Sequence, residues 1–152
     1  AYFFVTGVNL PEAAINIQPV RGLKGVKTAE VEVAGTQIRV AVAHGMANVG
    51  KVLNQVREAR DNGEELPYHF IEVMACPGGC IGGGGQPYGI NDEVRRLRAA
   101  GLYEDDRDHV LRCSHDNPEI QRIYTDFLGE PNSERSHQLL HTTYNTRQVY
   151  LK

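Results

Sequence analysis

Two stretches of alternating polar and apolar residues in the first third of the chain predict a β-hairpin. Residues 28–33 alternate, Ala34-Gly35 can form a turn, and residues 37–43 resume the alternation. A period of two places successive side chains on opposite faces of a strand, and a short glycine-containing loop joins antiparallel neighbours. Upstream of the hairpin, Tyr2-Phe3-Phe4-Val5 predicts a further strand.

After the hairpin, the spacing of the apolar residues changes to that of a helix. Apolar residues recur every three or four positions from Val49 to Ala59, with Asn48 as the predicted N-cap and Asn62-Gly63 as the predicted end. Residues 70–74 are apolar and β-branched enough to predict a buried strand. The order strand, helix, strand predicts a βαβ crossover with parallel pairing of its two strands.

The second half of the chain is predicted to be helical. Cap residues, glycines and apolar faces bound three helices, over 91–101, 117–129 and 133–141, with a charged linker over 104–108. The predicted fold class is therefore α/β: a small mixed sheet with a β-hairpin and a βαβ crossover, followed by a helical C-terminal half.

Composition narrows the function classes. The chain has 152 residues, 41% of them hydrophobic and 23% charged, with a net charge of −3. Such a balance is ordinary for a globular domain and does not favour nucleic acid or an anionic membrane as a partner. The apolar runs fall short of the roughly 20 residues that span a bilayer, so we predict no membrane span. Three cysteines argue against a disulfide framework.

Two cysteines and a run of glycines come directly after the predicted 70–74 strand. Cys76 and Cys80 stand four residues apart, and six of the eight residues from Gly78 to Gly85 are glycine. Thiolates are the usual protein ligands of iron–sulfur clusters, and a loop with few side chains lets a bulky group approach backbone N–H groups. The lysine of a phosphate-binding P-loop is absent. The loop therefore favours an iron–sulfur cluster over a phosphate.

Residues 72–87 read Glu-Val-Met-Ala-Cys-Pro-Gly-Gly-Cys-Ile-Gly-Gly-Gly-Gly-Gln-Pro, which resembles the third cysteine motif of the iron-only ([FeFe]) hydrogenases. Residues 136–144 resemble the small-subunit segment that many of these enzymes carry fused to the C-terminus of the large subunit. Residues 20–26 and 40–45 resemble the family as well. The resemblance implies one lobe of the hydrogenase active-site domain over 1–129 and a small-subunit-like segment over 130–152.

The resemblance also implies roles at the loop. Cys76 would ligate a [4Fe–4S] cubane, and Cys80 would bridge the cubane to the di-iron unit where hydrogen reacts, so these two thiols are the predicted metal ligands. Cys80 and Met74 are the predicted catalytic residues, Met74 as an apolar wall near the di-iron unit. An ordinary core thioether is the alternative for Met74. The predicted cofactor-binding residues are Cys76, Cys80, Gly78, Gly79, Gly83 and Gly84.

In the family, the active-site cluster (the H-cluster) hangs from four cysteines, two of them on motifs N-terminal to this one. Neither of those motifs is in this sequence, and the chain begins at Ala1 without an initiator Met. We expect the C-terminal part of a hydrogenase catalytic subunit, inactive alone. Its expected partners are the N-terminal half of the same enzyme and a ferredoxin or nicotinamide-linked subunit, with protons and H2 as substrates. A cytoplasmic location is expected, or a periplasmic one if a missing N-terminus or a partner carries an export signal.

Two other function classes stay open. One is a non-catalytic iron–sulfur carrier or sensor with a hydrogenase-like fold, as in the eukaryotic relatives used in cytosolic cluster assembly. The other is a pure interaction domain. The eukaryotic relatives typically carry Pro-Ser-Gly-Cys, whereas Pro77-Gly78-Gly79-Cys80 stands here and favours the catalytic branch.

Further nitrogen and sulfur ligands occur downstream. His109, Cys113 and His115 could hold zinc, but they lack the paired spacing of structural zinc sites, so a free, partly buried Cys113 thiol is favoured. His137 and His141 lie one helical turn apart without a third ligand nearby, and we expect an interface role for them.

Overall fold

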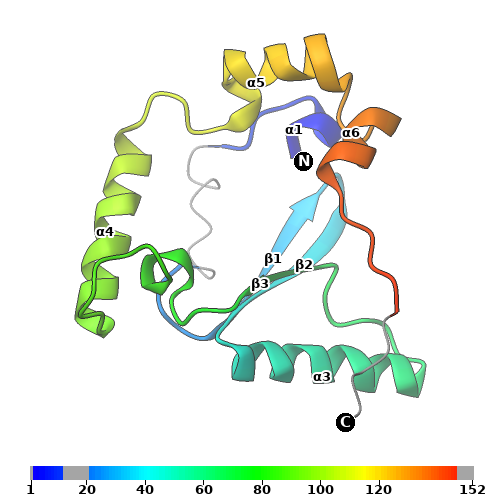
Figure 1. Ribbon diagram of the computed structural model, residues 1–152. Helices are drawn as coiled ribbons and strands as arrows, with labels where there is room; N and C mark the ends of the chain where they lie inside the picture. Colours follow the sequence, from blue (N-terminus) through cyan, green and yellow to red (C-terminus); the bar gives the residue numbers. More distant parts are fainter. Residues whose placement is uncertain (1, 12–20, 147–152) are drawn as a thin grey trace. The chain divides into compact units, whose positions relative to one another are not determined.

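The computed structural model describes residues 2–11 and 21–146 (Figure 1). The chain forms two compact units, Ala1–Tyr103 and Glu104–Lys152. The elements up to the boundary region are α1 (Tyr2–Thr6), β1 (Val26–Val33), β2 (Thr36–His44), α3 (Met46–Asn62), β3 (Phe70–Met74), the 3-10 turn η2 (Gly79–Gly82) and α4 (Asp92–Asp108). They are followed by η3 (Ser114–Asp116), α5 (Pro118–Ile123), η4 (Tyr124–Leu128) and α6 (Glu134–Leu140). The predicted α/β class with a small mixed sheet is confirmed.

The sheet has the predicted hairpin and the predicted parallel pair. Strands β1 and β2 pair antiparallel from Val26↔Ala43 to Val33↔Thr36, and β2 pairs with β3 in parallel. The strand order is β1-β2-β3. Ala34 and Gly35 both have positive φ, 50° and 78°, as a two-residue turn between twisted strands requires.

The predicted strand at Tyr2–Val5 is wrong, because these residues form the short helix α1. The Gly7 N–H donates to the Phe3 carbonyl at 2.8 Å, and the Thr6 hydroxyl donates to the Tyr2 carbonyl at 2.9 Å. Local hydrogen bonds therefore decide the conformation here, and β propensity alone does not.

Helix α3 covers one face of the sheet (Figure 1). Ala41 and Ala43 of β2 and Val49 and Val52 of α3 are buried and form the core between them. Small alanine side chains on the strand let the helix approach the sheet closely. Each buried valine contributes about 1.5–3 kcal/mol of hydrophobic free energy relative to an exposed one.

The predicted end of α3 is confirmed and its predicted start is wrong. Gly63 closes the helix with φ 70°, and its N–H bonds to the Ala59 and Arg60 carbonyls. At the start, Gly45 is the N-cap, and Asn48 lies inside the first turn, where its amide donates to the His44 carbonyl at 3.0 Å. A φ of 80° at Gly45 lets the chain turn from β2 directly into the helix.

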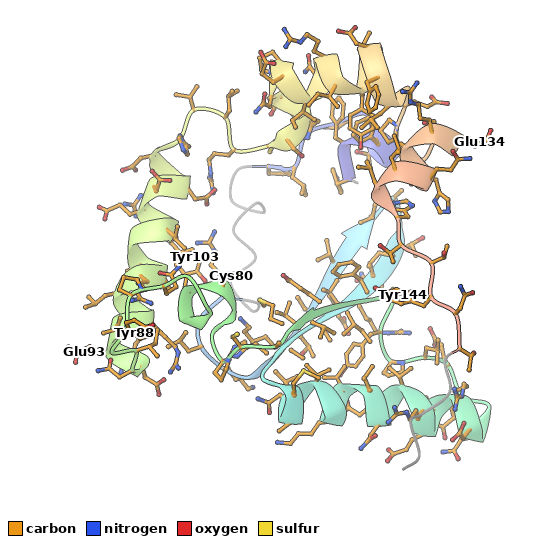
Figure 2. All side chains as sticks on the ribbon, in the orientation of Figure 1. Cys80, Tyr88, Glu93, Tyr103, Glu134 and Tyr144 are labelled. Carbon is orange, nitrogen blue, oxygen red and sulfur yellow. The ribbon has the colours of Figure 1, made fainter. Side chains whose placement is uncertain are left out.

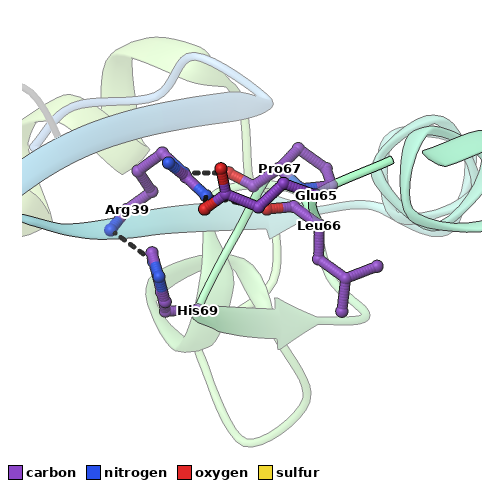
Figure 3. A network of polar contacts seen from close by, with 5 residues as sticks. All are labelled: Arg39, Glu65, Leu66, Pro67 and His69. Atoms are coloured by element: carbon purple, nitrogen blue, oxygen red, sulfur yellow. Dashed lines mark hydrogen bonds and ion pairs between the residues drawn. The ribbon is translucent and has the colours of Figure 1, made fainter. Parts of the chain in front are cut away.

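A network of polar contacts around Arg39 fixes the segment that leads into β3 (Figure 3). The Arg39 guanidinium lies 2.5 Å from Glu65 Oε1 and donates to the Leu66 carbonyl at 2.9 Å. It also donates to the Pro67 carbonyl at 3.0 Å, while the Arg39 backbone N–H donates to His69 Nδ1 at 3.0 Å. The hydrogen bond and charge of Arg39 lower the pKa of the Glu65 carboxyl. These contacts hold β3 in register with β2.

Strand β3 was predicted to be buried, and this is wrong for the described part of the chain. Phe70 is 58% and Val73 is 51% exposed. The strand lies at the edge of the sheet and pairs only with β2 among the described strands. The apolar composition of residues 70–74 predicts a strand, but it does not show whether other residues of the chain bury the faces of that strand.

Helix α4 is longer than predicted. Its start agrees with the sequence, since the Asn91 side chain accepts from the Val94 N–H at 2.8 Å. It passes through Gly101 and through the predicted charged linker to Asp108. One glycine costs a helix only about 1 kcal/mol, and pairs three residues apart, such as Glu104 with Arg107 (3.7 Å), favour continuation.

The predicted caps in the second unit are confirmed. The Asn117 side chain accepts from the Glu119 N–H at 2.9 Å at the start of α5, and the Ser133 hydroxyl accepts from the Ser136 N–H at 3.2 Å at the start of α6. Helix α5 widens into the π-helical turn η4, which ends at Gly129 with φ 80°. Within residues 2–11 and 21–146, no helix has the length and apolar character needed to cross a membrane.

Candidate cofactor site after strand β3

The glycine loop leaves the sheet where the parallel strands β2 and β3 end. His44 and Met74 are register partners at this edge, and the Gly45 N–H donates to the Met74 carbonyl at 2.9 Å. The carboxyl ends of parallel strands are where open α/β sheets bind ligands. Figure 2 shows Cys80 on the short turn η2 that follows.

Both thiols of the loop belong to tight turns. The Cys76 carbonyl accepts from the Gly79 N–H at 2.9 Å, and the Cys80 carbonyl accepts from the Gly83 N–H at 3.3 Å. Both cysteines are free, with Cys76 half-buried and Cys80 exposed. The backbone is thus folded locally while both sulfur atoms stay available as ligands.

Gly79 is required by geometry. Its φ is 72°, and a Cβ placed on it would lie 2.5 Å from the Met74 sulfur. An L side chain is strained at this φ, and the thioether occupies the space that the side chain would need. Met74 and Gly79 therefore pack directly on one another.

Gly82 and Gly83 let the backbone of the loop pass close to Pro77 and Cys76. A Cβ on Gly82 would collide with the Pro77 carbonyl oxygen, and one on Gly83 would lie 3.4 Å from the Cys76 sulfur. A Cβ on Gly84 would meet nothing within 4 Å. The Gly83 backbone therefore lies directly against the Cys76 sulfur, and open space begins at Gly84.

His44 holds the turn between the two thiols. Its Nδ1 accepts from the Gly78 N–H at 2.9 Å, and its side chain is 4% exposed. Its Nε2 is buried and has no hydrogen-bond partner within the described residues. Burial is the main cause of a lowered His44 pKa, and the charges of Lys27 and Arg95 act in the same direction, opposed by the Lys24 carbonyl. His44 is therefore a neutral acceptor at neutral pH.

Acid should weaken this arrangement. The unfolded chain binds a proton at His44 near the ordinary value of 6.5, whereas the folded chain binds it only at lower pH. The free energy of unfolding should therefore fall as the pH drops below about 6.5, and this loss should be smaller in His44→Gln. Urea unfolding at a series of pH values measures both slopes. Equal acid slopes in the two chains would contradict the expectation.

Two arginines of α4 lie against the loop. Arg98 donates to the Ile81 carbonyl at 2.9 Å and to the Pro87 carbonyl at 3.3 Å. Arg95 pairs with Asp92 at 2.6 Å and packs against the position that a Cβ on Gly78 would take. Helix α4 thus fixes the loop through Arg98 and packs Arg95 against Gly78.

A cavity of about 220 Å³ lies under the loop, on the sheet face that α3 does not cover. Lys27, Glu72, His44 and Met74 line it from the strands, and Gly78 lines it from the loop. The Lys27 side chain is buried and donates to the Gly22 carbonyl at 3.0 Å. Burial lowers the pKa of Lys27, and the Glu72 carboxylate opposes this shift. The cavity wall is therefore polar at one end and apolar at Met74.

The structure brings the predicted loop residues together and adds residues that sequence reasoning missed. Met74 and Gly78 share the cavity wall, and Cys76 lies beside Gly83. The additional residues are Lys27, His44, Arg95 and Arg98. A signal for Lys27 exists in the sequence, since the hairpin register places it across from Val42, on the face that His44 shares.

Downstream, the structure separates the predicted ligand candidates. Ligand atoms of Cys113, His115 and Asp116 lie within 4.8 Å of one another, and His109 is not part of this group. His137 and His141 approach each other through their Nδ1 atoms at 2.5 Å.

Two family models match the chain. The C-terminal domain of the iron-only hydrogenase large subunit matches residues 1–84, and the iron hydrogenase small subunit matches residues 92–147.

Curated relatives agree with these models. The chain is 48% identical over 149 residues to the NADP-reducing hydrogenase subunit HndD of Solidesulfovibrio fructosivorans, covering 97% of this chain and 24% of that protein. It is 40% identical to iron hydrogenase 1 of Clostridium pasteurianum, covering 86% and 23%. It is also 35% identical to cytosolic iron-sulfur assembly component 3 of Rattus norvegicus, covering 88% and 27%. The chain spans about a quarter of the length of these relatives.

A solved structure shares the fold. The [FeFe]-hydrogenase HydA1 from Chlamydomonas reinhardtii superposes with a TM-score of 0.69 at 32% sequence identity, over 94% of this chain and 42% of that one. Together with the match of a family model to more than half of the residues, this shows that the chain belongs to the iron-only hydrogenase family.

Proposed function

We propose that this chain is the C-terminal part of the catalytic subunit of an iron-only hydrogenase and supplies two of the four cysteine ligands of its H-cluster. Cys76 would ligate the [4Fe–4S] cubane, and Cys80 would be the ligand that the cubane shares with the di-iron unit. The observation that carries the proposal is the pair of free thiols on adjacent tight turns at the carboxyl edge of β2 and β3.

The residues present fit such a cofactor. Thiolates are soft ligands suited to iron–sulfur clusters, and hydrogen bonds from backbone N–H groups tune their potential. The loop beside the Cys76 sulfur carries only hydrogen at Gly83, and Gly84 faces open space. When bound, the cluster supplies the redox chemistry of 2H⁺ + 2e⁻ ⇌ H₂.

In this proposal, the residues of the chain hold the glycine loop in position and shield the cofactor. Met74 packs under Gly79 and would form an apolar wall near the cofactor. His44 holds the Gly78 N–H, and Arg98 holds the Ile81 carbonyl directly after Cys80. Gly78 and Gly79 let Arg95 and Met74 pack against the loop, Gly83 lets the backbone lie beside the Cys76 sulfur, and Gly84 leaves open space for the cofactor.

The remaining ligands and the electrons come from elsewhere in this proposal. The other two cysteines belong to the N-terminal half of the same enzyme, so the chain alone is inactive. A ferredoxin or a nicotinamide-linked subunit delivers the electrons, and the name of one relative, an NADP-reducing hydrogenase subunit, supports the latter. The division into 1–129 and 130–152 and a cytoplasmic location stay predictions.

Cys76→Ser in the full-length enzyme tests the ligand assignment. A serine oxygen is a poor match for iron of the cubane, so the variant should lose cluster iron and the paramagnetic signal of the reduced cubane. Iron analysis and electron paramagnetic resonance measure both. Ile81→Val, next to Cys80 in the same turn, alters volume but no sulfur and should keep its iron. A Cys76→Ser enzyme with full iron content would refute the assignment.

The second candidate function is a non-catalytic iron–sulfur carrier or sensor. The 35% identity to a cytosolic iron-sulfur assembly component favours it specifically. Both candidates use the two thiols, but only the hydrogenase should evolve H₂ from a reduced dye once the full-length protein carries its clusters. If the cluster-loaded, full-length protein evolves no H₂, the result would favour the non-catalytic carrier or sensor.

A further inference from the structure

The second unit contains a group of three potential metal ligands that lies outside the hydrogenase site. The Cys113 sulfur, a ring nitrogen of His115 and a carboxylate oxygen of Asp116 all lie within 4.8 Å of one another. The three residues come from four consecutive positions at the turn η3, which precedes α5. We propose that Cys113, His115 and Asp116 bind a single Zn²⁺ ion, with water in the fourth position.

The distances are close to those that a shared metal needs. Tetrahedral zinc with bonds of roughly 2.0–2.3 Å separates its ligand atoms by about 3.3–3.6 Å. His115 Nε2 lies 3.7 Å from Asp116 Oδ1, which is too far for a hydrogen bond but near this separation. The Cys113 sulfur lies within 4.8 Å of both of these atoms.

The backbone of the turn is already fixed. The Cys113 carbonyl accepts from the Asp116 N–H at 3.1 Å, and the Ser114 carbonyl accepts from the Asn117 N–H at 3.2 Å. The Gln121 side chain, one turn into α5, donates to the His115 carbonyl at 2.7 Å. Three ligands on a held backbone lose less conformational entropy when they bind a metal than three on a mobile loop.

Burial and charge suit an open site. Cys113 is half-buried, the His115 side chain is 18% exposed and the Asp116 side chain is 47% exposed, so a cation can reach the group from the Asp116 side. The neighbouring Arg112 guanidinium is paired with Asp106 at 2.9 Å, which offsets its repulsion of a cation. A thiolate, an imidazole and a carboxylate form a donor set that suits Zn²⁺.

Titration of the 152-residue chain with Co²⁺, a spectroscopic substitute for Zn²⁺, tests the site. The background is Cys76→Ala/Cys80→Ala, so that Cys113 is the one remaining thiol. We expect one equivalent of Co²⁺ with a thiolate-to-metal charge-transfer band, displaced by ZnCl₂. Cys113→Ser in this background should remove the band, and Asp116→Asn should weaken binding by at least the roughly 10–100-fold seen when a metal site loses an outer partner.

Two controls separate this site from others. His109→Ala, which removes an exposed histidine of the same unit, should leave the band and the affinity unchanged. Binding at His137 and His141 would give no thiolate band. A Co²⁺ complex that lacks the band, or that keeps it in Cys113→Ser, would overturn the proposal.

A second measurement needs no substitution. In the unaltered chain, Zn²⁺ should slow alkylation of Cys113 by iodoacetamide, as located by peptide mass spectrometry. It should also raise the unfolding temperature, because a ligand that binds only the folded state stabilises it by mass action. Alkylation of Cys113 at the same rate with and without Zn²⁺ would contradict the site.

Discussion

Cys80→Ser in the full-length enzyme should reduce hydrogen evolution to background and lower the iron content. In the proposed site, the Cys80 sulfur is the bridge between the two parts of the cofactor, and serine oxygen is too hard a ligand to replace it on iron. Cys80 is also the exposed member of the pair, on a turn whose carbonyls are held by Gly83 and Arg98. The substitution therefore removes a ligand without removing a core contact.

Iron analysis, electron paramagnetic resonance and a hydrogen assay with a reduced dye measure this effect. The comparison with Cys76→Ser is informative, because the proposal requires both thiols to hold cluster iron. If Cys80→Ser kept its hydrogen activity, the bridging role would be refuted even if Cys76 proved to be a ligand.

Gly79→Ala should destabilise the 152-residue chain and displace Met74. A left-handed φ of 72° costs an alanine about 1–2 kcal/mol, and its Cβ would lie 2.5 Å from the Met74 sulfur. The thioether can rotate away, so the lasting consequence is a loop without its apolar wall. In the full-length enzyme, hydrogen activity should fall together with the free energy of unfolding.

Two comparisons isolate the causes. Gly101→Ala lies mid-helix in open space and should stabilise the chain by up to about 1 kcal/mol. Adding Met74→Ala to Gly79→Ala removes the collision but not the strain at φ, so the double variant should show less than the sum of the two single losses. Urea unfolding of the unaltered chain, the three single variants and the double variant gives the values. Strict additivity would mean that Met74 and Gly79 do not contact each other.

The features that could be predicted from sequence are those decided by neighbouring residues. The hairpin turn at Ala34-Gly35, the end of α3 at Gly63 and the caps at Asn117 and Ser133 all depend on a few consecutive residues. Tyr2–Thr6 has β-prone residues yet forms a helix, because local hydrogen bonds outweigh a weak propensity. Gly101 is only a weak helix breaker, and helix α4 continues through it to Asp108.

The candidate site divides in the same way. The two thiols and the glycines could be predicted because their chemistry lies in one short motif. Lys27, His44 and Arg98 come from β1, β2 and α4, so only the register of the sheet and the position of α4 bring them to the loop. Their roles depend on tertiary contacts that spacing along the chain does not encode.

Among the strands that the structure describes, nothing pairs with the outer edge of β3, and this has a consequence for biogenesis. Its outer row of backbone N–H and C=O groups, flanked by the exposed Phe70 and Val73, can template pairing with any extended segment. Until a proper neighbour covers it, a newly made chain is a candidate for self-association and for capture by chaperones.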